Sequence, residues 1–549
     1  MAWYDEAIFY HIYPLGMTGA PKQNDYGEIN HRLNFLIPFI SHIQKLGCNA
    51  IYIGPLFESV GHGYETTDYK KLDTRLGTNE DLKNFVACCH KQGIKVVLDG
   101  VFNHTGRDFF AFRDIRQNRE NSRYKDWYCN VNFYGNNEYN DGFSYDNWGG
   151  YNLLAKLNQH NTEVREYICE VIRFWVKEFD IDGIRLDAAD VLNFDYMQTL
   201  RKTANEVKPD FWLMGEVIHG DYNRWVNGNT LHSVTNYHLH KALYSGHNDH
   251  NYFEIAHTVK RLYEMGGNSP DGFKLYNFVD NHDVERIYTK LNKKSHFTPV
   301  HILLYTLPGI PSVYYGSEFG IEGQKQYGSD DSLRPAVSYD EYVNYTSNNH
   351  LTNLISSLGK IRQETKALSY GDYKELYLSN CQYAFSREYD GQSVIVTVNN
   401  SDDDFVMNLH SCNEKGYVGG LFGEKIPSED GCISLTVKAN SGEIWLPLCR
   451  ADDCVQFETS KVEENKKSMA DCVKTTETEN YESEKEIAKP QENHNIKPDK
   501  TYEEMTVEEL QEAILEKMKR IGPVTEQMKK DVSDNIYHDS LVTWVKSFN

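Results

Sequence analysis

Long hydrophobic runs are missing from this sequence of 549 residues, and none approaches the roughly 20 apolar residues that a membrane-spanning helix needs. Positive charge is also scarce, because 57 Lys and Arg face 80 Asp and Glu, a net charge of −23. This balance argues against a nucleic acid partner and against docking on an anionic membrane. We therefore expect neither a nucleic acid nor a membrane as a partner.

Cysteine is present but unorganised. The 11 cysteines are odd in number and show no C-x-x-C spacing, so neither a disulfide framework nor a zinc knuckle is indicated. The first residues have no basic segment followed by an apolar run and a small-residue cleavage site, so they do not resemble a secretory signal. Together these absences predict a cytoplasmic protein.

Short apolar, β-branched runs alternate with segments of helical period from residue 1 to about 365. Eight runs qualify as strands, and they cover residues 7–14, 49–53, 95–101, 183–188, 211–216, 234–239, 275–280 and 311–315. Segments 79–92, 162–179 and 195–207 predict helices, with Asn79 and Thr162 as N-caps. No glycine-rich phosphate turn follows the first strand, so the alternation favours a (β/α)8 TIM barrel over an open doubly wound α/β sheet.

Three other regions depart from this alternation. Residues 105–158, after the third strand, are too long and aperiodic for a simple loop and predict a small inserted subdomain. Residues 366–449 alternate as short strands and predict a C-terminal antiparallel β-sandwich. Residues 450–500 predict an acidic disordered linker, and residues 501–549 predict a helical tail that could bind a protein partner or self-associate.

Acidic and histidine-rich clusters follow four of the predicted strands. They read Asp99-Gly-Val-Phe-Asn-His104, Gly183-Ile-Arg185-Leu-Asp187, Gly215-Glu216-Val217 and Asp280-Asn-His282-Asp283. In a barrel the carboxyl ends of all strands converge on one face. We therefore expect Asp187, Glu216 and Asp283 to share one pocket.

The surroundings of two of these carboxyls suggest opposite roles. Arg185 and Asp187 lie two residues apart on one strand and face the same side, so the guanidinium should lower the pKa of Asp187 and keep it ionised as a nucleophile. Glu216, near other carboxylates, should have a raised pKa, which suits a general acid. Glycoside hydrolysis uses such a pair of carboxyls, and His104, His282 and Asp283 offer partners for sugar hydroxyls.

In this order the four clusters resemble those of glycoside hydrolase family 13, the α-amylase family, and the resemblance covers residues 1 to about 449. It implies that Asp187 is the nucleophile, Glu216 the acid/base, and Asp283 the carboxylate that grips the sugar at the cleavage site. Arg185, His104 and His282 match residues that accompany them in the family. The resemblance also implies that Tyr64 is an aromatic platform under that sugar and that Asp330 and Arg334 close its far side.

Residues 155–158, Ala-Lys-Leu-Asn, are similar to a Pro-Lys-Leu-Asn segment of the neopullulanase and cyclomaltodextrinase branch, although the chain starts directly at the barrel, without that branch's N-terminal domain. The resemblance implies a retaining hydrolase of α-1,4 bonds in maltooligosaccharides or other α-glucan oligosaccharides. A 4-α-glucan transglycosylase and a cyclomaltodextrinase- or neopullulanase-type enzyme are the alternatives within the class. A metal-dependent barrel hydrolase, with ligands Asp99, His104, His282 and Asp283, and a catalytically silent binding scaffold are disfavoured alternatives from other classes.

No cofactor is expected. Many family members bind calcium where the insert meets the barrel, through an Asn that matches Asn103, an acidic residue and a His. Here Lys156 stands at the acidic position and Val191 at the His position. Because a hard dication needs several oxygen ligands, we expect calcium to be absent and Lys156 to stand in its place.

Overall fold

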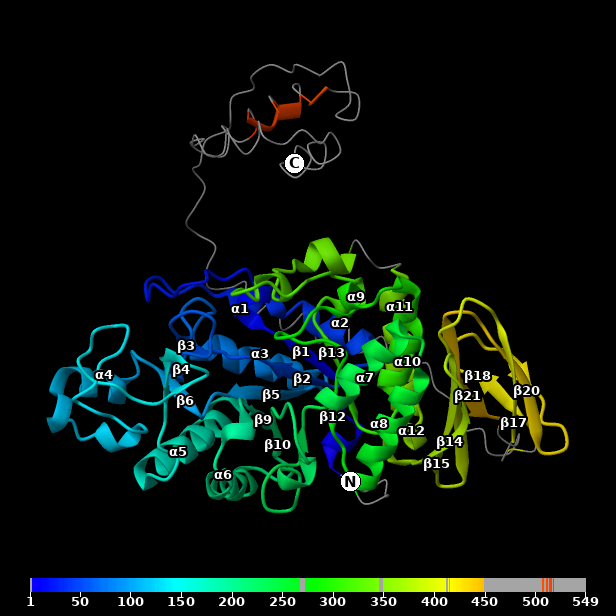
Figure 1. Cartoon of the computed structure of the whole chain (residues 1–549), viewed down its shortest axis with the longest axis horizontal. Coiled ribbons are helices and arrows are strands. Elements are labelled where there is room, and N and C mark those ends of the chain that lie inside the picture. Colours follow the sequence, from blue (N-terminus) through cyan, green and yellow to red (C-terminus); the bar gives the residue numbers. More distant parts are fainter. Residues whose placement is uncertain are drawn as a thin grey trace. The chain divides into compact units, whose positions relative to one another are not determined.

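The computed structural model describes residues 2–266, 272–344, 349–410, 413 and 415–448, together with positions 506, 507, 510, 511, 513–515 and 517. Eight parallel strands form its central sheet, and helices surround them (Figure 1). Their order in the sheet is β11 (Ser233–Val234), β10 (Trp212–Gly215), β9 (Gly183–Leu186), β5 (Lys95–Gly100), β2 (Ala50–Ile53), β1 (Phe9–Ile12), β13 (Ile310–Tyr314) and β12 (Tyr276–Asn277). A parallel bridge between Thr235 and Tyr276 joins the two edges. The predicted (β/α)8 barrel is therefore confirmed.

Each predicted strand overlaps one barrel strand, and the run 234–239 differs most. There β11 ends at Val234 and helix α7 begins at Tyr237. The side chain of Asn236 accepts the Leu239 N–H at 3.1 Å and so caps the helix. The cap formed by Asn236 therefore starts a helix where the β-branched pattern predicts that the strand continues.

Helices follow or connect the strands in chain order. They are α1 (Pro14–Met17), α2 (Phe39–Lys45), α3 (Asn79–Lys91), α5 (Thr162–Phe179), α6 (Phe194–Val207), α7 (Tyr237–Asn248), α8 (Tyr252–Met265), α9 (Ile287–Lys290), α10 (Phe297–Thr306), α11 (His350–Glu364) and α12 (Lys366–Tyr370). The N-caps of α3 and α5 are Thr78 and Asn161, one residue before the predicted Asn79 and Thr162. Asn79 instead accepts the Leu72 N–H at 2.8 Å.

The barrel strands are buried on both faces, which is why they read as continuous apolar runs. On β1, Phe9 points into the barrel and stacks on Trp212 with 5.0 Å between ring centroids. Its neighbours Ile8 and Tyr10 pack in the separate core beneath the helices. The apolar interior leaves polar side chains to the strand ends.

The insert between β5 and α5 carries its own small sheet and helix. Its strands are β6 (His104–Gly106), β8 (Tyr151–Lys156) and β7 (Asn147–Trp148), paired in that order, and its helix is α4 (Phe110–Asn118). A hairpin of β3 (Phe57–Ser59) and β4 (Thr66–Leu72) leaves the barrel after β2. Both project from the ends of barrel strands, where they flank the polar clusters.

The C-terminal domain is antiparallel. Its larger sheet has the order β14 (Asp372–Leu378), β15 (Gln382–Tyr389), β16 (Gln392–Asn399), β21 (Ser441–Pro447), β18 (Tyr417–Gly419) and β19 (Lys425–Ile426). A ribbon of β17 (Phe405–His410) and β20 (Cys432–Val437) covers one face. Alternation along β15 explains the sandwich, because Ala384 packs towards the ribbon, whereas Tyr383 and Phe385 join the barrel's core.

The predicted linker over 450–500 and most of the predicted tail over 501–549 lie outside the described residues. The described positions between 507 and 517 are helical. The Leu510 N–H donates to the Thr506 carbonyl at 3.0 Å, which agrees with a helix that starts at Thr506. Among the described residues, no helix has the length and apolar character to cross a bilayer.

Candidate active site

The polar clusters meet at the carboxyl ends of neighbouring strands. Asp99 on β5 lies opposite Arg185 on β9 in the parallel register, and Arg185 lies opposite Met214 on β10. Asp187 follows β9 directly, and Glu216 follows β10 directly. The predicted convergence of the strand ends therefore sets these carboxylates around one guanidinium.

Arg185 binds three carboxylates. Its Nη1 lies 2.9 Å from Asp99 Oδ1 and 2.9 Å from Asp187 Oδ1, and its Nη2 lies 2.8 Å from Glu216 Oε2. The side chains of Arg185 and Asp99 are enclosed, while those of Asp187 and Glu216 keep 10% and 13% exposure. Only these last two can meet a ligand from solvent.

Glu216 is also oriented from two other sides. Ala188 has a left-handed backbone, with φ of 46°, and its N–H donates to Glu216 Oε2 at 3.2 Å. The hydroxyl of Tyr237 donates to Oε1 at 3.3 Å and accepts an N–H from Asn281 at 3.2 Å. Residues other than glycine rarely adopt the left-handed backbone conformation of Ala188, and backbone strain of this kind is concentrated at functional sites.

The electrostatics of Asp187 differ from the sequence-based expectation. Burial raises its pKa, Arg185 lowers it, and the charges of Glu216, Asp99 and Asp283 raise it again, so that the pKa lies well above its usual value. The single positive charge is divided among three carboxylates. The prediction that Arg185 keeps the pKa of Asp187 low was wrong for this reason.

This arrangement predicts an acid limb in the pH dependence of activity. A nucleophilic Asp187 must be ionised, so activity should fall as pH falls through its raised pKa. Asp99→Asn removes one of the negative charges that compete for Arg185, so the guanidinium should stabilise ionised Asp187 more strongly and lower its pKa. We therefore expect the acid limb of kcat/KM to move to lower pH by about one unit. Asp195→Asn, at an exposed position in the first turn of α6, is the control. An unchanged limb in Asp99→Asn would contradict this account.

Asp283 lies in an environment of the opposite kind. Its Oδ2 is 3.0 Å from His282 Nε2, and its Oδ1 is 2.9 Å from Arg334 Nη2. Burial raises its pKa, but His282 and Arg334 outweigh burial and hold the pKa of Asp283 well below its usual range. Arg334 Nη2 also reaches Asp330 Oδ2 at 3.2 Å, so the predicted pair of Asp330 and Arg334 is present beside Asp283.

Aromatic rings fix the orientation of His282. Tyr13 and Tyr64 each stack nearly parallel to it, at 5.8 and 5.7 Å between centroids. The Tyr64 hydroxyl lies 2.5 Å from His282 Nε2 and 3.3 Å from Asp99 Oδ2. Tyr64 therefore connects Asp99, which binds Arg185, to His282, which binds Asp283. Only 9% of the surface of Tyr64 is exposed to solvent.

His104 lies apart from the carboxylates in β6, and the described chain shows no hydrogen bond or ion pair between them. Its ring is 6.0 Å from that of Trp148 in the insert. Burial lowers the pKa of His104 to about 3, so the ring is neutral. It can therefore exchange neutral hydrogen bonds with a ligand beside the exposed face of Trp148.

Sequence reasoning missed three partners of the site. Asp99 was named in the first cluster and as a hypothetical metal ligand but given no catalytic role, and Tyr52, whose hydroxyl donates to Asp99 at 2.7 Å, was not singled out. Tyr237 lies in the run that was predicted as a strand. The predicted strand that contains Tyr237 is followed in the barrel by the strand that ends at Asp283's cluster. Because the ends of neighbouring strands meet, this order was the one available signal for Tyr237.

The closed barrel and its shared carboxylates define a (β/α)8-barrel glycoside hydrolase. Residues 32–351 match the model of the alpha-amylase catalytic domain, and residues 371–445 match the alpha-amylase C-terminal domain. The chain therefore belongs to the α-amylase family, glycoside hydrolase family 13.

Relatives and solved structures agree with this assignment. A cyclomaltodextrinase of Thermoanaerobacter pseudethanolicus is 32% identical over 436 residues, which cover 75% of this chain and 73% of the relative. Neopullulanase 2 of Thermoactinomyces vulgaris is 29% identical, with 80% and 78% covered. The native debranching enzyme of Nostoc punctiforme has a TM-score of 0.71 at 28% identity, with 81% of this chain and 98% of that chain covered.

Proposed function

We propose that this enzyme hydrolyses α-1,4 bonds of α-glucan oligosaccharides by double displacement with net retention. The observation that carries the proposal is that neighbouring nitrogens of Arg185 hold Asp187 and Glu216, at 2.9 and 2.8 Å. Retaining enzymes keep their two carboxyls about 5 Å apart, whereas inverting enzymes need roughly 6.5–9.5 Å for a water between them. Because a single guanidinium holds both carboxyls, their separation favours the shorter spacing of a retaining enzyme. The names of the relatives support the α-glucan substrate.

The steps follow from the positions of these groups. Asp187 attacks the anomeric carbon while Glu216 donates a proton to the departing glycosidic oxygen. Glu216, now ionised, takes a proton from water, which attacks the same carbon and releases Asp187. Asp283, held ionised by His282 and Arg334, accepts hydrogen bonds from hydroxyls of the bound sugar.

Two measurements test this function. The anomer released first from a linear maltodextrin should be α, as NMR of fresh product would show, and a β product would overturn the retaining mechanism. A second candidate is transfer to a sugar hydroxyl or action on cyclic or branched glucans, which the cyclomaltodextrinase and neopullulanase relatives favour. Products longer than maltotriose from maltotriose would indicate transfer, and rates on pullulan and cyclodextrin would rank the substrates.

The geometry does not favour a metal-dependent hydrolase. Asp99 is bound to Arg185 Nη1, so a cation already occupies the place where a metal would meet this carboxylate. Within the described ranges, no group of three or more His, Cys, Asp or Glu is arranged to hold a metal ion.

An amide side chain contacts Asn103, the residue that matches the family's calcium-binding Asn. Gln159 Nε2 donates to Asn103 Oδ1 at 3.0 Å, and Gln159 Oε1 accepts the Asn193 N–H at 2.6 Å. Asn103 and Gln159 are buried. Within the described chain the Lys156 ammonium has no hydrogen bond or ion pair. We propose that the enzyme needs no calcium and that Gln159, rather than Lys156, links the insert to α6.

This proposal predicts that EDTA changes neither activity nor melting temperature. Gln159→Leu should cost about 2–3 kcal/mol of stability, because it leaves the buried Asn103 Oδ1 and the part-buried Asn193 N–H unpaired. Lys156→Ala is the matched control and should leave the melting temperature unchanged. A drop with EDTA that added calcium reverses, or a loss of stability in Lys156→Ala alone, would contradict the proposal.

The C-terminal tail is proposed to act outside catalysis, in self-association or in binding a protein partner. Deletion of residues 451–549 should leave kcat/KM on small oligosaccharides nearly unchanged, because the residues of the site all lie before position 335. Kinetics and size-exclusion chromatography of the truncated chain check this. A large fall in kcat/KM would show that the tail supports the enzyme itself.

The name of a relative, the intracellular maltogenic amylase of Bacillus subtilis, supports a cytoplasmic location.

A further inference from the structure

Two arginines are buried at the end of the barrel opposite the catalytic cluster. Arg362 on α11 and Arg387 on β15 are each 2% exposed. They lie around the C-terminus of α10, before β13 begins, and the catalytic reaction proposed above uses neither of them. Their charges therefore need a separate explanation.

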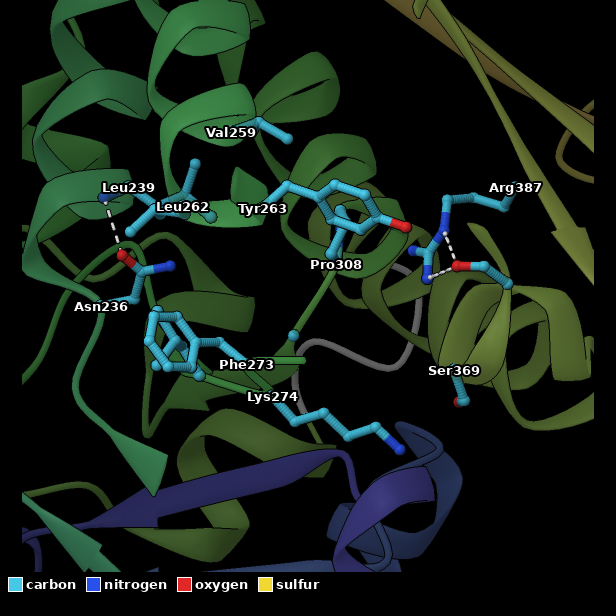
Figure 2. A pocket seen from close by; sticks show the side chains of 13 residues that line it. Asn236, Leu239, Val259, Leu262, Tyr263, Phe273, Lys274, Pro308, Ser369 and Arg387 are labelled. Atoms are coloured by element: carbon cyan, nitrogen blue, oxygen red, sulfur yellow. Dashed lines mark hydrogen bonds between the residues drawn. The ribbon is translucent and has the colours of Figure 1, made fainter. Parts of the chain in front are cut away.

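Both guanidiniums bind only main-chain carbonyls. Arg362 Nη1 and Nη2 donate to the carbonyls of Tyr305 and Gly309 at 2.5 and 2.6 Å. Arg387 Nη1 donates to the Thr306 carbonyl at 2.7 Å. Figure 2 shows its other two hydrogen bonds, which end on one oxygen, the carbonyl of Gly371. In the part of the chain that the structure describes, neither arginine forms an ion pair, and the buried Nε of Arg362 has no hydrogen-bond partner.

The carbonyls compensate the two charges incompletely. A helix C-terminus carries about half a negative charge. The C-terminus of α10 faces both arginines and the C-cap of α12, Gly371, faces Arg387, so two half charges meet two full positive charges. Burial, and after it the nearby charge of Arg387, lower the pKa of Arg362 to about 9. Burial likewise lowers the pKa of Arg387 to about 10. Buried charge without a counterion is costly, so an anion would be bound favourably.

A cavity of about 220 Å³ lies beside Arg362. Its lining consists of Arg362, Gln363, Lys366, Ser369, Glu6 and Asn49. Ser369 also borders the smaller pocket of Arg387 and Lys274 that is drawn in Figure 2. A cavity of this size accommodates a small ion with some water, because a single water takes about 30 Å³ of liquid volume.

The lining is suited to an anion. Lys366 and Arg362 bring two positive charges, and Glu6 brings one negative charge. The Glu6 carboxylate is already engaged, because its Oε1 lies 2.5 Å from Lys366 Nζ and 2.8 Å from the Tyr370 hydroxyl. The remaining donors are the Ser369 hydroxyl and the other N–H groups of Lys366, while the unpartnered Nε of Arg362 is buried behind them and contributes its charge. Positive charge is thus concentrated here in a chain whose net charge is −23.

We propose that this cavity is a binding site for a tetrahedral oxyanion of the phosphate class. The anion would join α11, α12 and the segment before β1, and so stabilise the base of the barrel next to the C-terminal domain. The same chemistry is offered by free phosphate and by the phosphate group of a hexose phosphate. The two sources are separated by the test.

Thermal unfolding of the full chain tests the site, with phosphate compared with chloride at equal pH and ionic strength. At ten times Kd, bound phosphate should raise the melting temperature by about 1–2 °C. Lys366→Met removes a donor and leaves the charge of Glu6 without its ion pair, so it should abolish the rise. Ser369→Ala should reduce it. Lys360→Met removes an exposed charge from the preceding helix, α11, and should keep the full rise. Isothermal titration calorimetry with phosphate should rank the variants in the same order.

The outcomes separate the possibilities. A larger rise with glucose 1-phosphate than with phosphate that is lost in Lys366→Met would identify the phosphate group of a sugar as the ligand of this cavity, whereas a rise with phosphate alone would identify the free ion. The proposal is overturned if phosphate gives no rise, or if Lys366→Met shows the same rise as Lys360→Met. None of these results depends on whether the enzyme hydrolyses α-glucans.

Discussion

Asp187→Asn is expected to lower kcat on maltooligosaccharides by roughly 10⁴–10⁶-fold, the scale on which loss of a nucleophile acts in other hydrolases. An amide cannot attack the anomeric carbon. Its Oδ1 can still accept the hydrogen bond from Arg185 that the structure gives at 2.9 Å, so the strand end keeps its shape. Substrate affinity, measured by calorimetry, should therefore change little while turnover is lost.

Asp190→Asn is a matched control for this variant. Asp190 lies three residues further on, is exposed, and makes no side-chain contact with Arg185. It should keep turnover within about threefold. Asp187→Gly should in addition regain some turnover with azide and release a glycosyl azide of inverted anomeric configuration, because a small anion can enter the vacated space. Near-normal kcat in Asp187→Asn would rule out the nucleophile assigned here.

Glu216→Gln is expected to lower kcat/KM on maltooligosaccharides by about 10²–10⁴-fold, the usual contribution of general acid–base catalysis. The Ala188 N–H lies 3.2 Å from Glu216 Oε2, and an amide oxygen can replace that acceptor. The variant should fold normally, since the amide oxygen can still accept the hydrogen bonds of Ala188 and Arg185, while the proton donor and the base are lost. Steady-state kinetics and the melting temperature of the same preparation give both quantities.

The leaving group provides the internal control for Glu216. A nitrophenolate departs without protonation, so the first step on a nitrophenyl maltooligoside should suffer much less than the same step on maltotriose. A burst of nitrophenol followed by slow turnover is the expected time course, because the second step still lacks its base. Equal losses on both substrates would show that Glu216 supports binding rather than proton transfer.

Much of the fold was predictable because local sequence patterns indicate the strands and helices of the barrel. Strands buried on both faces are continuous apolar runs, and all eight were found within a few residues. The errors came from side chains whose partners a pattern cannot show. Asn236 ends a β-branched run by capping α7. The N-caps of α3 and α5 are Thr78 and Asn161, each one residue before the predicted cap.

The candidate site was predictable in its members and less so in its energetics. Asp187, Glu216 and Asp283 stand at strand ends, and a barrel brings strand ends together. The contact between Arg185 and Asp187 was also foreseeable, since they are two residues apart on one strand. Gln159 was missed because nothing in its local sequence indicates that its amide reaches Asn103, 56 positions away.

By itself, the sequence determined which elements form, which of their ends carry carboxylates, and the family to which the chain belongs, because these follow from short-range periodicity and from clusters of adjacent residues. Only the tertiary structure decided how charge is shared. Asp99 lies 86 positions before Arg185 and competes with Asp187 for the same nitrogen, and Glu216 binds the other one. A pKa sums the effects of burial and of every charge nearby in space, so the raised pKa of Asp187 and the lowered pKa of Asp283 depend on distances that no local pattern contains.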